Sequence, residues 1–586
     1  MLTTMSLNGM WDFVADLDPK YHAQHSGFHR PDADRRHWLR VPVPCVWQQV
    51  SERYDIFEGV CWFAREFDLL PGAENASARL RFGAVSHLAN VYLNGEWVGR
   101  HEGAYTEFVL DVTGKLKQGR NQIAVQVDNR ATSIQWPPCL GYFNYGGIHR
   151  DVALELLDGA ALDDVAVRAA PAGDGGTLAV SGTVREPETG LSVAVACTDA
   201  RVVVRPDPDG HFSCDLGVHG VSPWSPEEPN LYDVTVSLNR QDEHLDTRKY
   251  ACGFRAIEMR GGRVHLNGSP LTLKGVCYVY DSPATGLVMA EEQVATDVAL
   301  IKELGCNAVR CHYPMDERFY AACDRAGLLV WVEPNVYCYS PANDESGTMF
   351  ARAESRAVAE TMVVEMIATA RNHPSVAIYG IGNECNTAHP EAAPFFRRLA
   401  ALVREHAPAH LVSYAALYGN VGPLADMVDV LGINSYWGWY DRIWGGKGLE
   451  PDANAAPEAI DLAPMRRMLD EVLEKDQGLA LLLTEFGADS VPGQHSPRRA
   501  LWSEEYHADL LREIFALAAA YPQIAGTFPF CFSDYRDPSK IHNGYWNELN
   551  LKGLVTYARD KKAAFAAVQE LYAAVETWPG TPPRVE

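Results

Sequence analysis

Two glutamates follow apolar stretches of this chain in the same way. Glu384 follows the run Val376-Ala-Ile-Tyr-Gly-Ile-Gly-Asn383, and Glu485 follows the run Leu479-Ala-Leu-Leu-Leu-Thr. Such runs are typical of strands buried on both faces of a parallel sheet. In α/β barrels, the ends of such strands carry the reactive groups. Two carboxyl groups placed there could cleave a glycosidic bond. One would protonate the leaving oxygen, and the other would attack the sugar carbon or activate water.

A surface role is the alternative for each glutamate. The chain has 76 acidic residues, and most acidic side chains in proteins are solvated surface charges. Glu384 and Glu485 differ from that background because both follow a buried-strand pattern and both have glycine close by. The repeated pattern favours a catalytic interpretation of the two residues together.

The last part of the chain, from about residue 255, must bring these glutamates together. Apolar strand candidates alternate there with amphipathic helical stretches, which predicts a (β/α)8 TIM barrel. The expected strands are 273–277, 307–310, 328–332, 376–381, 411–414, 428–434, 479–484 and 524–530. Glu384 follows the fourth strand and Glu485 the seventh, so closure of the barrel would place both on one rim.

The first 254 residues show a different pattern, in which short alternating strands are separated by turns. Residues 89–98 contain two strand candidates around Asn94-Gly95, a strong hairpin signal. We therefore predict a β jelly-roll sandwich over 1–157 and an immunoglobulin-like β-sandwich over 158–254, followed by the catalytic barrel over 255–586.

Composition excludes several functions. The net charge of -25 argues against a nucleic-acid partner, because phosphate binding needs concentrated Lys and Arg. No apolar run reaches membrane-spanning length, and the N-terminus has no signal-peptide pattern. The 13 scattered cysteines indicate reduced thiols and a cytoplasmic location. No CxxC or HExxH pattern occurs, and we expect no metal or cofactor.

Motifs along nearly the whole chain resemble one known family. Gly382-Asn383-Glu384 resembles the acid/base motif of glycoside hydrolase family 2, and Thr484-Glu485-Phe-Gly487 resembles its nucleophile motif. The segments 7–13, 41–47 and 143–150 resemble the sugar-binding jelly roll of that family, and 253–255 resembles its entry into the barrel. The segments 434–440 and 502–506 resemble the versions found in its β-glucuronidase branch.

The resemblance implies a retaining mechanism with carboxyl groups about 5–5.5 Å apart. Glu485 would be the nucleophile and Glu384 the acid/base. By the family pattern, Tyr436 would hydrogen-bond Glu485, and Asn383 would bind the sugar 2-hydroxyl. The alternatives are a packed aromatic ring for Tyr436 and a turn-forming residue for Asn383.

Asn550-Leu-Lys552 resembles the family motif that binds the sugar carboxylate. A buried uronate in this acidic protein would need a countercharge, which a lysine supplies. Alone, the motif is a weak signal, because a lysine in a solvated loop is the commoner case. The flanking residues 546–565 also resemble the family segment, which favours the binding role. His312 and Trp437 are further candidates for the sugar pocket, and His495 for the aglycone side. The aromatic residues Trp439, Phe530 and Tyr535 could stack on sugar faces, or they could belong to the core.

The sequence departs from the family pattern at several places. Gly141 stands where glucuronidases have an aspartate that reaches the 4-hydroxyl. Val279 and Tyr280 replace a His-Glu pair, and Trp546 lies near the place of an arginine that assists with the carboxylate. These departures leave the C4 configuration of the sugar and its aglycone open.

Three functions are consistent with the sequence. The first is a retaining exo-β-glucuronidase acting on a small glycoside or an oligosaccharide. The second is the same chemistry on another sugar, as in a β-galacturonidase or β-galactosidase. The third is a carbohydrate-binding protein without catalysis, which the presence of both carboxylates disfavours. The resemblance also implies a homo-oligomer.

Overall fold

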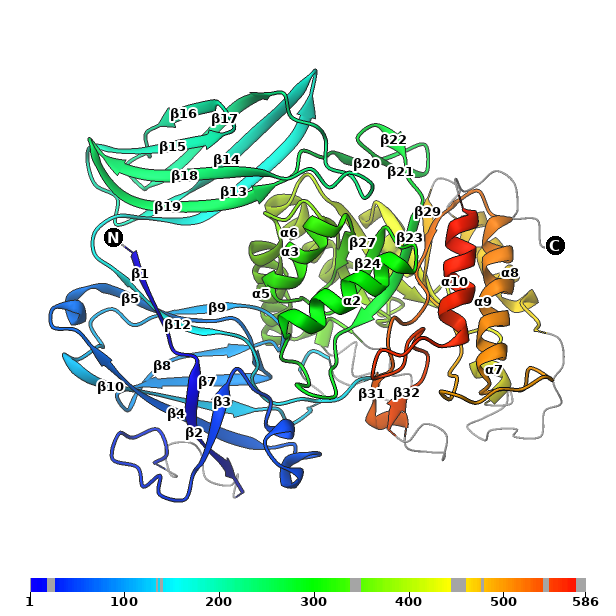
Figure 1. Ribbon diagram of the computed structural model, residues 1–586, viewed down its shortest axis with the longest axis horizontal. Helices are drawn as coiled ribbons and strands as arrows, with labels where there is room; N and C mark the ends of the chain where they lie inside the picture. The colour runs from blue at the N-terminus through cyan, green and yellow to red at the C-terminus, as the bar shows by residue number, and fades with distance from the viewer. Residues whose placement is uncertain are drawn as a thin grey trace.

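Two β-sandwiches lie beside a barrel in the computed structural model, which describes residues 2–17, 27–132, 135–137, 141–337, 349–443, 460–475, 479–540 and 548–575 (Figure 1). The predicted fold class is confirmed, with two sandwich domains preceding a closed barrel of eight strands. The exact limits at 157 and 254 stay a prediction. Within the described residues, no helix combines the length and apolarity needed to cross a membrane.

The first sandwich packs a four-stranded sheet of order β1-β12-β5-β9 against a six-stranded sheet of order β3-β2-β4-β10-β7-β8. The predicted hairpin is present, because Asn94 and Gly95 both adopt positive φ (54° and 87°) between β7 and β8. The strands are β1 (Leu2–Ser6), β2 (Gly9–Asp16), β3 (Leu39–Val43), β4 (Val60–Leu69), β5 (Ser77–Phe82), β6 (Val85–Ser86), β7 (Leu88–Leu93), β8 (Glu96–Glu102), β9 (Phe108–Asp111), β10 (Gly119–Asp128), β11 (Gly147–Ile148) and β12 (Val152–Leu157).

The second sandwich packs a three-stranded sheet (β13-β14-β17) against a four-stranded sheet (β16-β15-β18-β19). Its core is built from alternate residues of the strands, as the sequence pattern predicts. The strands are β13 (Ala161–Ala172), β14 (Gly175–Arg185), β15 (Leu191–Cys197), β16 (Ala200–Val204), β17 (His211–His219), β18 (Tyr232–Arg240) and β19 (Glu243–Cys252). A small three-stranded sheet then leads into the barrel; it contains β20 (Ile257–Arg260), β21 (Arg263–Leu266) and β22 (Ser269–Pro270).

The barrel closes through parallel pairing of β30 with β23. All eight predicted strands are present, namely β23 (Leu273–Val279), β24 (Ala308–His312), β25 (Leu329–Val332), β26 (Val376–Asn383), β27 (Leu411–Leu417), β28 (Val430–Asn434), β29 (Ala480–Glu485) and β30 (Ile524–Thr527). The last strand ends earlier than predicted, at Thr527, although Phe528 and Phe530 still donate backbone hydrogen bonds to Leu483 and Phe486.

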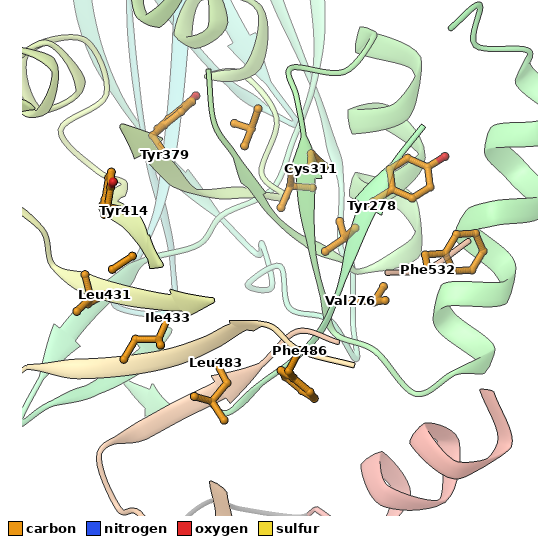
Figure 2. Close-up of a cluster of buried hydrophobic side chains, with 14 of the residues drawn as sticks. Val276, Tyr278, Cys311, Tyr379, Tyr414, Leu431, Ile433, Leu483, Phe486 and Phe532 are labelled. Carbon is orange, nitrogen blue, oxygen red and sulfur yellow. The ribbon is translucent and has the colours of Figure 1, made fainter. Parts of the chain in front are cut away.

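Side chains of the barrel strands alternate between two cores. Cys277, Trp331 and Leu482 belong to the cluster inside the barrel, whereas their neighbours belong to the cluster beneath the helices. Figure 2 shows part of this outer cluster, with Val276, Tyr278, Cys311, Leu431 and Ile433 among the labelled side chains. Because both faces are buried, these strands are apolar runs in the sequence.

Helices cover the barrel, as the amphipathic stretches between the strands predict. In α3 (Glu317–Ala326), for example, the apolar residues Phe319, Tyr320 and Cys323 are buried. The helices are α2 (Glu291–Glu303), α3 (Glu317–Ala326), α5 (Ala353–Ala370), α6 (Ala392–His406), α7 (Tyr440–Ile443), α8 (Ala463–Lys475), α9 (Glu504–Ala519) and α10 (Ala563–Ala574).

A short hairpin of β31 (Tyr535–Arg536) and β32 (Leu549–Asn550) lies on the side of the barrel nearer the first sandwich (Figure 1). It is tied to that sandwich, because the backbone N–H of Phe143 donates to the carbonyl of Arg536 at 2.9 Å. Short 3-10 turns complete the described elements; they are η1 (Trp47–Gln49), η2 (Glu52–Tyr54), η3 (Ala73–Asn75), η4 (Gly422–Met427) and η5 (Pro538–Lys540).

Candidate active site

The two glutamates lie at the carboxyl ends of barrel strands. Glu485 is the last residue of β29, and Glu384 directly follows β26. Glu384 adopts φ 50°, a left-handed conformation that is uncommon for residues other than glycine and is often found at functional sites. Its backbone N–H donates to the carbonyl of Ala415 on β27 at 2.9 Å, which fixes the turn out of the strand.

Glu485 is buried and surrounded by donors. Arg310 Nη1 donates to Glu485 Oε1 at 2.9 Å, and the Tyr436 hydroxyl donates to Oε2 at 2.7 Å. His312 Nε2 lies 3.4 Å from the same Oε1 atom. Burial alone would raise the pKa of Glu485, but His312, Arg310 and Tyr436 together lower it below its ordinary value. This carboxyl group is therefore held in the ionised form.

Glu384 is only partly buried and has a sparser environment. Asn434 Nδ2 donates to Glu384 Oε1 at 2.7 Å. Burial, and then the negative charge of Glu485, raise the pKa of Glu384 well above its ordinary value, and the Asn434 hydrogen bond offsets this only in part. The two carboxyl groups therefore interact across the rim and are driven toward opposite protonation states.

A network of buried polar groups connects the two glutamates. Arg310 Nη2 donates to Asn383 Oδ1 at 2.9 Å, and Asn434 Nδ2 donates to the same oxygen at 2.9 Å. The Thr484 hydroxyl donates to Asn434 Oδ1 at 2.7 Å. Asn383 is thus a fixed amide whose oxygen is already occupied, which leaves its Nδ2 group as the donor that it can offer to a ligand.

Arg310 and Glu333 form an ion pair that the sequence analysis did not identify. Arg310 is fully buried, and its Nη2 atom donates to Glu333 Oε1 at 2.7 Å. Its guanidinium also lies 5.1 Å from the centre of the Trp331 ring. The sequence does contain a signal for Glu333, because it follows the apolar strand β25 as the two glutamates follow theirs.

Asn550 and Lys552, predicted to bind a carboxylate, are both buried and lie together. Lys552 Nζ lies 3.3 Å from Asn550 Oδ1 and 5.4 Å from the centre of the Tyr436 ring. Since the Tyr436 hydroxyl donates to Glu485, the ring of Tyr436 connects this lysine to the predicted nucleophile. Asn550 Nδ2 donates to the Tyr535 hydroxyl at 3.0 Å.

A second lysine and a buried aspartate complete this cluster. Lys552 Nζ lies 2.9 Å from Asp489 Oδ2, and the ammonium groups of Lys552 and Lys540 both donate to the Tyr440 hydroxyl, at 2.8 and 2.7 Å. Burial alone would lower the pKa of Lys552, but Asp489 raises it, so the lysine stays charged. Asp537 is buried beside them and accepts from Asn550 Nδ2 at 3.3 Å, so the described part of this rim holds two lysines and two buried aspartates.

The other predicted site residues have mixed outcomes. His312 is buried, and its Nε2 atom lies 3.3 Å from Glu333 Oε1 as well as close to Glu485. Phe530 packs edge-on against His312 and Tyr436, with ring centres 6.0 and 6.3 Å apart. Trp437 contacts Tyr418, with ring centres 5.3 Å apart.

Two of the predicted residues lie outside the hydrogen-bond network of the two glutamates. His495 is exposed, and its Nδ1 atom lies 2.8 Å from Glu505, so it takes part in a surface ion pair and not in the network around the two glutamates. Trp439 is fully buried and donates from Nε1 to Asp489 Oδ2 at 2.7 Å. Its position supports that aspartate and leaves no ring face for a sugar.

The departures from the family pattern have structural explanations in part. The Tyr280 hydroxyl donates to the carbonyl of Val288, and its ring belongs to the outer barrel core. Val279 packs against the inner core. The carbonyl of Gly141 accepts from the Tyr535 hydroxyl at 3.3 Å, which places this glycine beside Asn550. Trp546 lies outside the described residues.

Comparison with known proteins agrees with this architecture. Three family models match in order: "Glycosyl hydrolases family 2, sugar binding domain" over 40–157, "Glycosyl hydrolases family 2" over 158–255, and "Glycosyl hydrolases family 2, TIM barrel domain" over 257–577. A β-glucuronidase from Paenibacillus borealis is 26% identical over 98% of this chain and 97% of that protein.

Solved structures with the same fold cover nearly the whole chain. The β-glucuronidase from Ruminococcus gnavus in complex with D-glucuronic acid matches with a TM-score of 0.86 and 24% identity, covering 97% of this chain and 98% of that one. The GH2 β-galacturonidase from Eisenbergiella tayi bound to galacturonate matches with a TM-score of 0.83 and 27% identity, covering 98% of both chains. The chain belongs to family 2 of the glycosyl hydrolases and is a glycoside hydrolase.

Proposed function

We propose that this glycoside hydrolase is a retaining exo-enzyme that removes terminal β-linked uronic acids, with glucuronides as its substrates. The observation that carries the proposal is the buried ammonium group of Lys552, which lies beside Asn550 and against the ring of Tyr436, the residue that bonds to Glu485. An ammonium group at that place can bind the carboxylate of a uronic acid, which a neutral sugar lacks.

In the first step, the ionised Glu485 attacks the anomeric carbon while Glu384 gives its proton to the glycosidic oxygen. The bond from that carbon to the oxygen breaks, and the aglycone leaves as an alcohol. The opposite pKa shifts of the two residues support these roles, because a nucleophile must be ionised and a general acid must be protonated.

In the second step, Glu384 acts as a base on water. It takes a proton from the water molecule, the water oxygen attacks the anomeric carbon, and Glu485 leaves as a carboxylate. We propose that Asn383 donates its Nδ2 group to the 2-hydroxyl of the sugar, since its oxygen is occupied by Arg310 and Asn434.

The charged groups of the lysine cluster can accommodate an anionic substrate. Lys552 is already matched by Asp489, so a uronate placed there would set two carboxylates beside one ammonium group. Lys540, which shares the Tyr440 hydroxyl with Lys552, supplies the second positive charge. Asp537 is also buried here and accepts from Asn550 Nδ2 at 3.3 Å; burial raises the pKa of Asp537, so this carboxyl group can take up a proton when a uronate adds a further negative charge.

Galacturonides are the second candidate substrates. The galacturonate-bound relative from Eisenbergiella tayi is 27% identical to this chain over 98% of its length. In addition, Gly141 offers no side chain to the sugar at the place where the family pattern has an aspartate. Both candidates share the carboxylate and differ only at C4.

A turnover panel tests the proposal. It compares 4-nitrophenyl β-D-glucuronide and β-D-galacturonide with the matching neutral glucoside and galactoside. We expect kcat/KM for one of the uronides to exceed that for its neutral counterpart by about 10- to 100-fold, the range that hydrogen bonds to a charged group supply. Equal or faster turnover of the neutral glycosides would overturn the uronate assignment.

Two variants separate the carboxylate site from the catalytic acids. Lys540→Met keeps the ion pair between Lys552 and Asp489, and we expect it to lower kcat/KM on the uronide about tenfold without affecting the neutral glycoside. Lys552→Met combined with Asp489→Asn removes one charge of each sign and should have the larger effect. If both variants lose uronide and neutral activity equally, the cluster has no role in specificity.

We also propose a cytoplasmic, homo-oligomeric protein. The basis is the cysteine pattern for location and the family resemblance for assembly. Light scattering on the purified protein measures the mass in solution, and a monomer would contradict the second part of this proposal.

A further inference from the structure

A continuous arc of contacts joins the carboxylate-binding cluster to Asn383 without passing the two catalytic glutamates. Beginning at Lys552, it runs through Asn550, whose Nδ2 atom donates to the Tyr535 hydroxyl at 3.0 Å. That hydroxyl donates in turn to the carbonyl of Gly141 at 3.3 Å. The arc thus crosses from the barrel hairpin to a loop of the first sandwich.

Tyr337 closes the arc on the other side of Gly141. A methyl carbon placed on Gly141 would lie 3.1 Å from the Tyr337 hydroxyl oxygen, so the two residues are in direct contact. The backbone of Tyr337 forms a parallel bridge to Asn383. Its ring packs with Tyr105, Tyr142 and Tyr313, which hold it in place.

Tyr337 lies between Gly141, which is beside its hydroxyl, and Asn383, to which its backbone is bridged. Burial raises the pKa of Tyr337, and the charges of Glu384, Glu485 and Asp537 raise it further. Tyr337 is only partly buried, so its hydroxyl is open to a hydrogen bond with a ligand.

The order of atoms in a pyranose ring indicates which part of the sugar the residues of this arc would contact. Our proposed function places the 2-hydroxyl at Asn383 and the C6 carboxylate at Lys552, and the present inference rests on that placement. Carbons 3 and 4 lie between carbons 2 and 5 of the ring. The groups that lie between Asn383 and Lys552 on the arc must therefore meet the C3–C4 edge of the sugar.

We infer that Tyr337 is a specificity-determining residue, and that its hydroxyl hydrogen-bonds a ring hydroxyl on the C3–C4 edge of the terminal uronic acid. Gly141 makes this possible, because a side chain at position 141 would displace the phenol oxygen. Tyr337 acts on substrate discrimination and not on the bond-breaking steps, which belong to Glu384 and Glu485.

The test combines Tyr337→Phe with deoxy substrates. The substrates are the preferred 4-nitrophenyl uronide and its 3-deoxy and 4-deoxy analogues. We expect Tyr337→Phe to lower kcat/KM about tenfold on the parent uronide and to have no effect on the analogue that lacks the partner hydroxyl. An equal loss on all three substrates, or no loss on any, would overturn the inference.

Gly141→Ala supplies an independent measurement. In the otherwise unchanged protein, the added methyl group should push the phenol oxygen aside and lower kcat/KM on the parent uronide. In the Tyr337→Phe background that oxygen is gone, so the same substitution should cost much less. Additive losses would show that the two residues act separately and would contradict the proposed contact.

The outcome for Tyr337 can be told apart from the outcome for the proposed function. If the unaltered protein does not turn over uronides, the proposed function fails, and with it the placement of the sugar. If it turns over uronides and Tyr337→Phe does so at the same rate on every substrate, only the assignment of Tyr337 fails.

Discussion

Glu485 and Glu384 lie on the same rim of the barrel in very different surroundings. Glu485 receives hydrogen bonds from Arg310 and Tyr436 and has His312 close to it, whereas Glu384 receives one hydrogen bond from a neutral amide. Two identical side chains can therefore take opposite roles, because the number and charge of the donors around each carboxyl group decide its protonation state.

The largest expected effect comes from removing either carboxyl group. Glu485→Ala should lower kcat by about 10⁴-fold or more, since no covalent intermediate can form. Glu384→Ala should cost about 10²–10⁴-fold, and less on aryl glycosides whose leaving group needs no protonation. Rates on 4-nitrophenyl and 2,4-dinitrophenyl uronides measure this difference.

Adding azide to each of these two variants shows on which face of the sugar each glutamate acts. In Glu485→Ala it can attack in place of the missing nucleophile and give an α-glycosyl azide. In Glu384→Ala it can intercept the glycosyl-enzyme and give the β-product. NMR spectroscopy identifies the anomer, and the same anomer from both variants would contradict the contrast between these residues.

A smaller effect is expected for Arg310, which donates directly to Glu485 and to Glu333. Arg310→Met leaves the carboxylates of Glu333 and Glu485 buried without their cation, and the free energy of unfolding should fall by about 3–5 kcal/mol. Urea denaturation measures this change.

A surface arginine serves as the matched control. The Arg36 side chain is 81% exposed and pairs with Asp34, so Arg36→Met should leave the free energy of unfolding almost unchanged. Equal losses in the two variants would show that the buried ion pair has no special importance for stability.

The smallest effect is expected for Tyr436→Phe, which removes one hydrogen bond from Glu485. That bond stabilises the ionised carboxylate by about 1.5–3 kcal/mol. Its loss should raise the pKa of Glu485, and the acidic limb of the kcat/KM profile should move to higher pH by about one to two units.

The alkaline limb of that profile, which reports deprotonation of Glu384, should stay in place. Glu485 is ionised at that end of the profile in both proteins, so its effect on Glu384 does not change. A shift of the alkaline limb alone would indicate that Tyr436 acts on Glu384, and the comparison between the two glutamates would need revision.

Much of the fold, and part of the contrast between Glu485 and Glu384, could be predicted from the sequence. The apolar runs before Glu384 and Glu485 predicted both strands and their shared rim, because continuous apolar runs of this length are typical of parallel strands buried on both faces. Glu333 follows the same rule and could have been found. Arg310 carried a subtler signal: it is a charged residue inside an apolar strand, which requires a buried partner.

The remainder of the site depends on contacts between distant loops. Nothing near Lys540 in the sequence indicates that it shares the Tyr440 hydroxyl with Lys552. Nothing near Tyr337 indicates that it touches Gly141. Likewise, His495 follows Glu485 closely in the chain but ends on the surface. Sequence proximity is informative along a strand and loses its meaning once the chain enters a loop.

The contact between Tyr535 and Gly141 joins positions separated by 394 residues. One wall of the predicted sugar pocket is thus contributed by a domain that is usually regarded as an accessory. If the barrel were expressed alone, its sugar pocket would lack that wall. If the barrel were joined to the first sandwich of another protein, its sugar preference should follow that sandwich. Attempts to change what this protein cleaves should begin in the loop of the first domain.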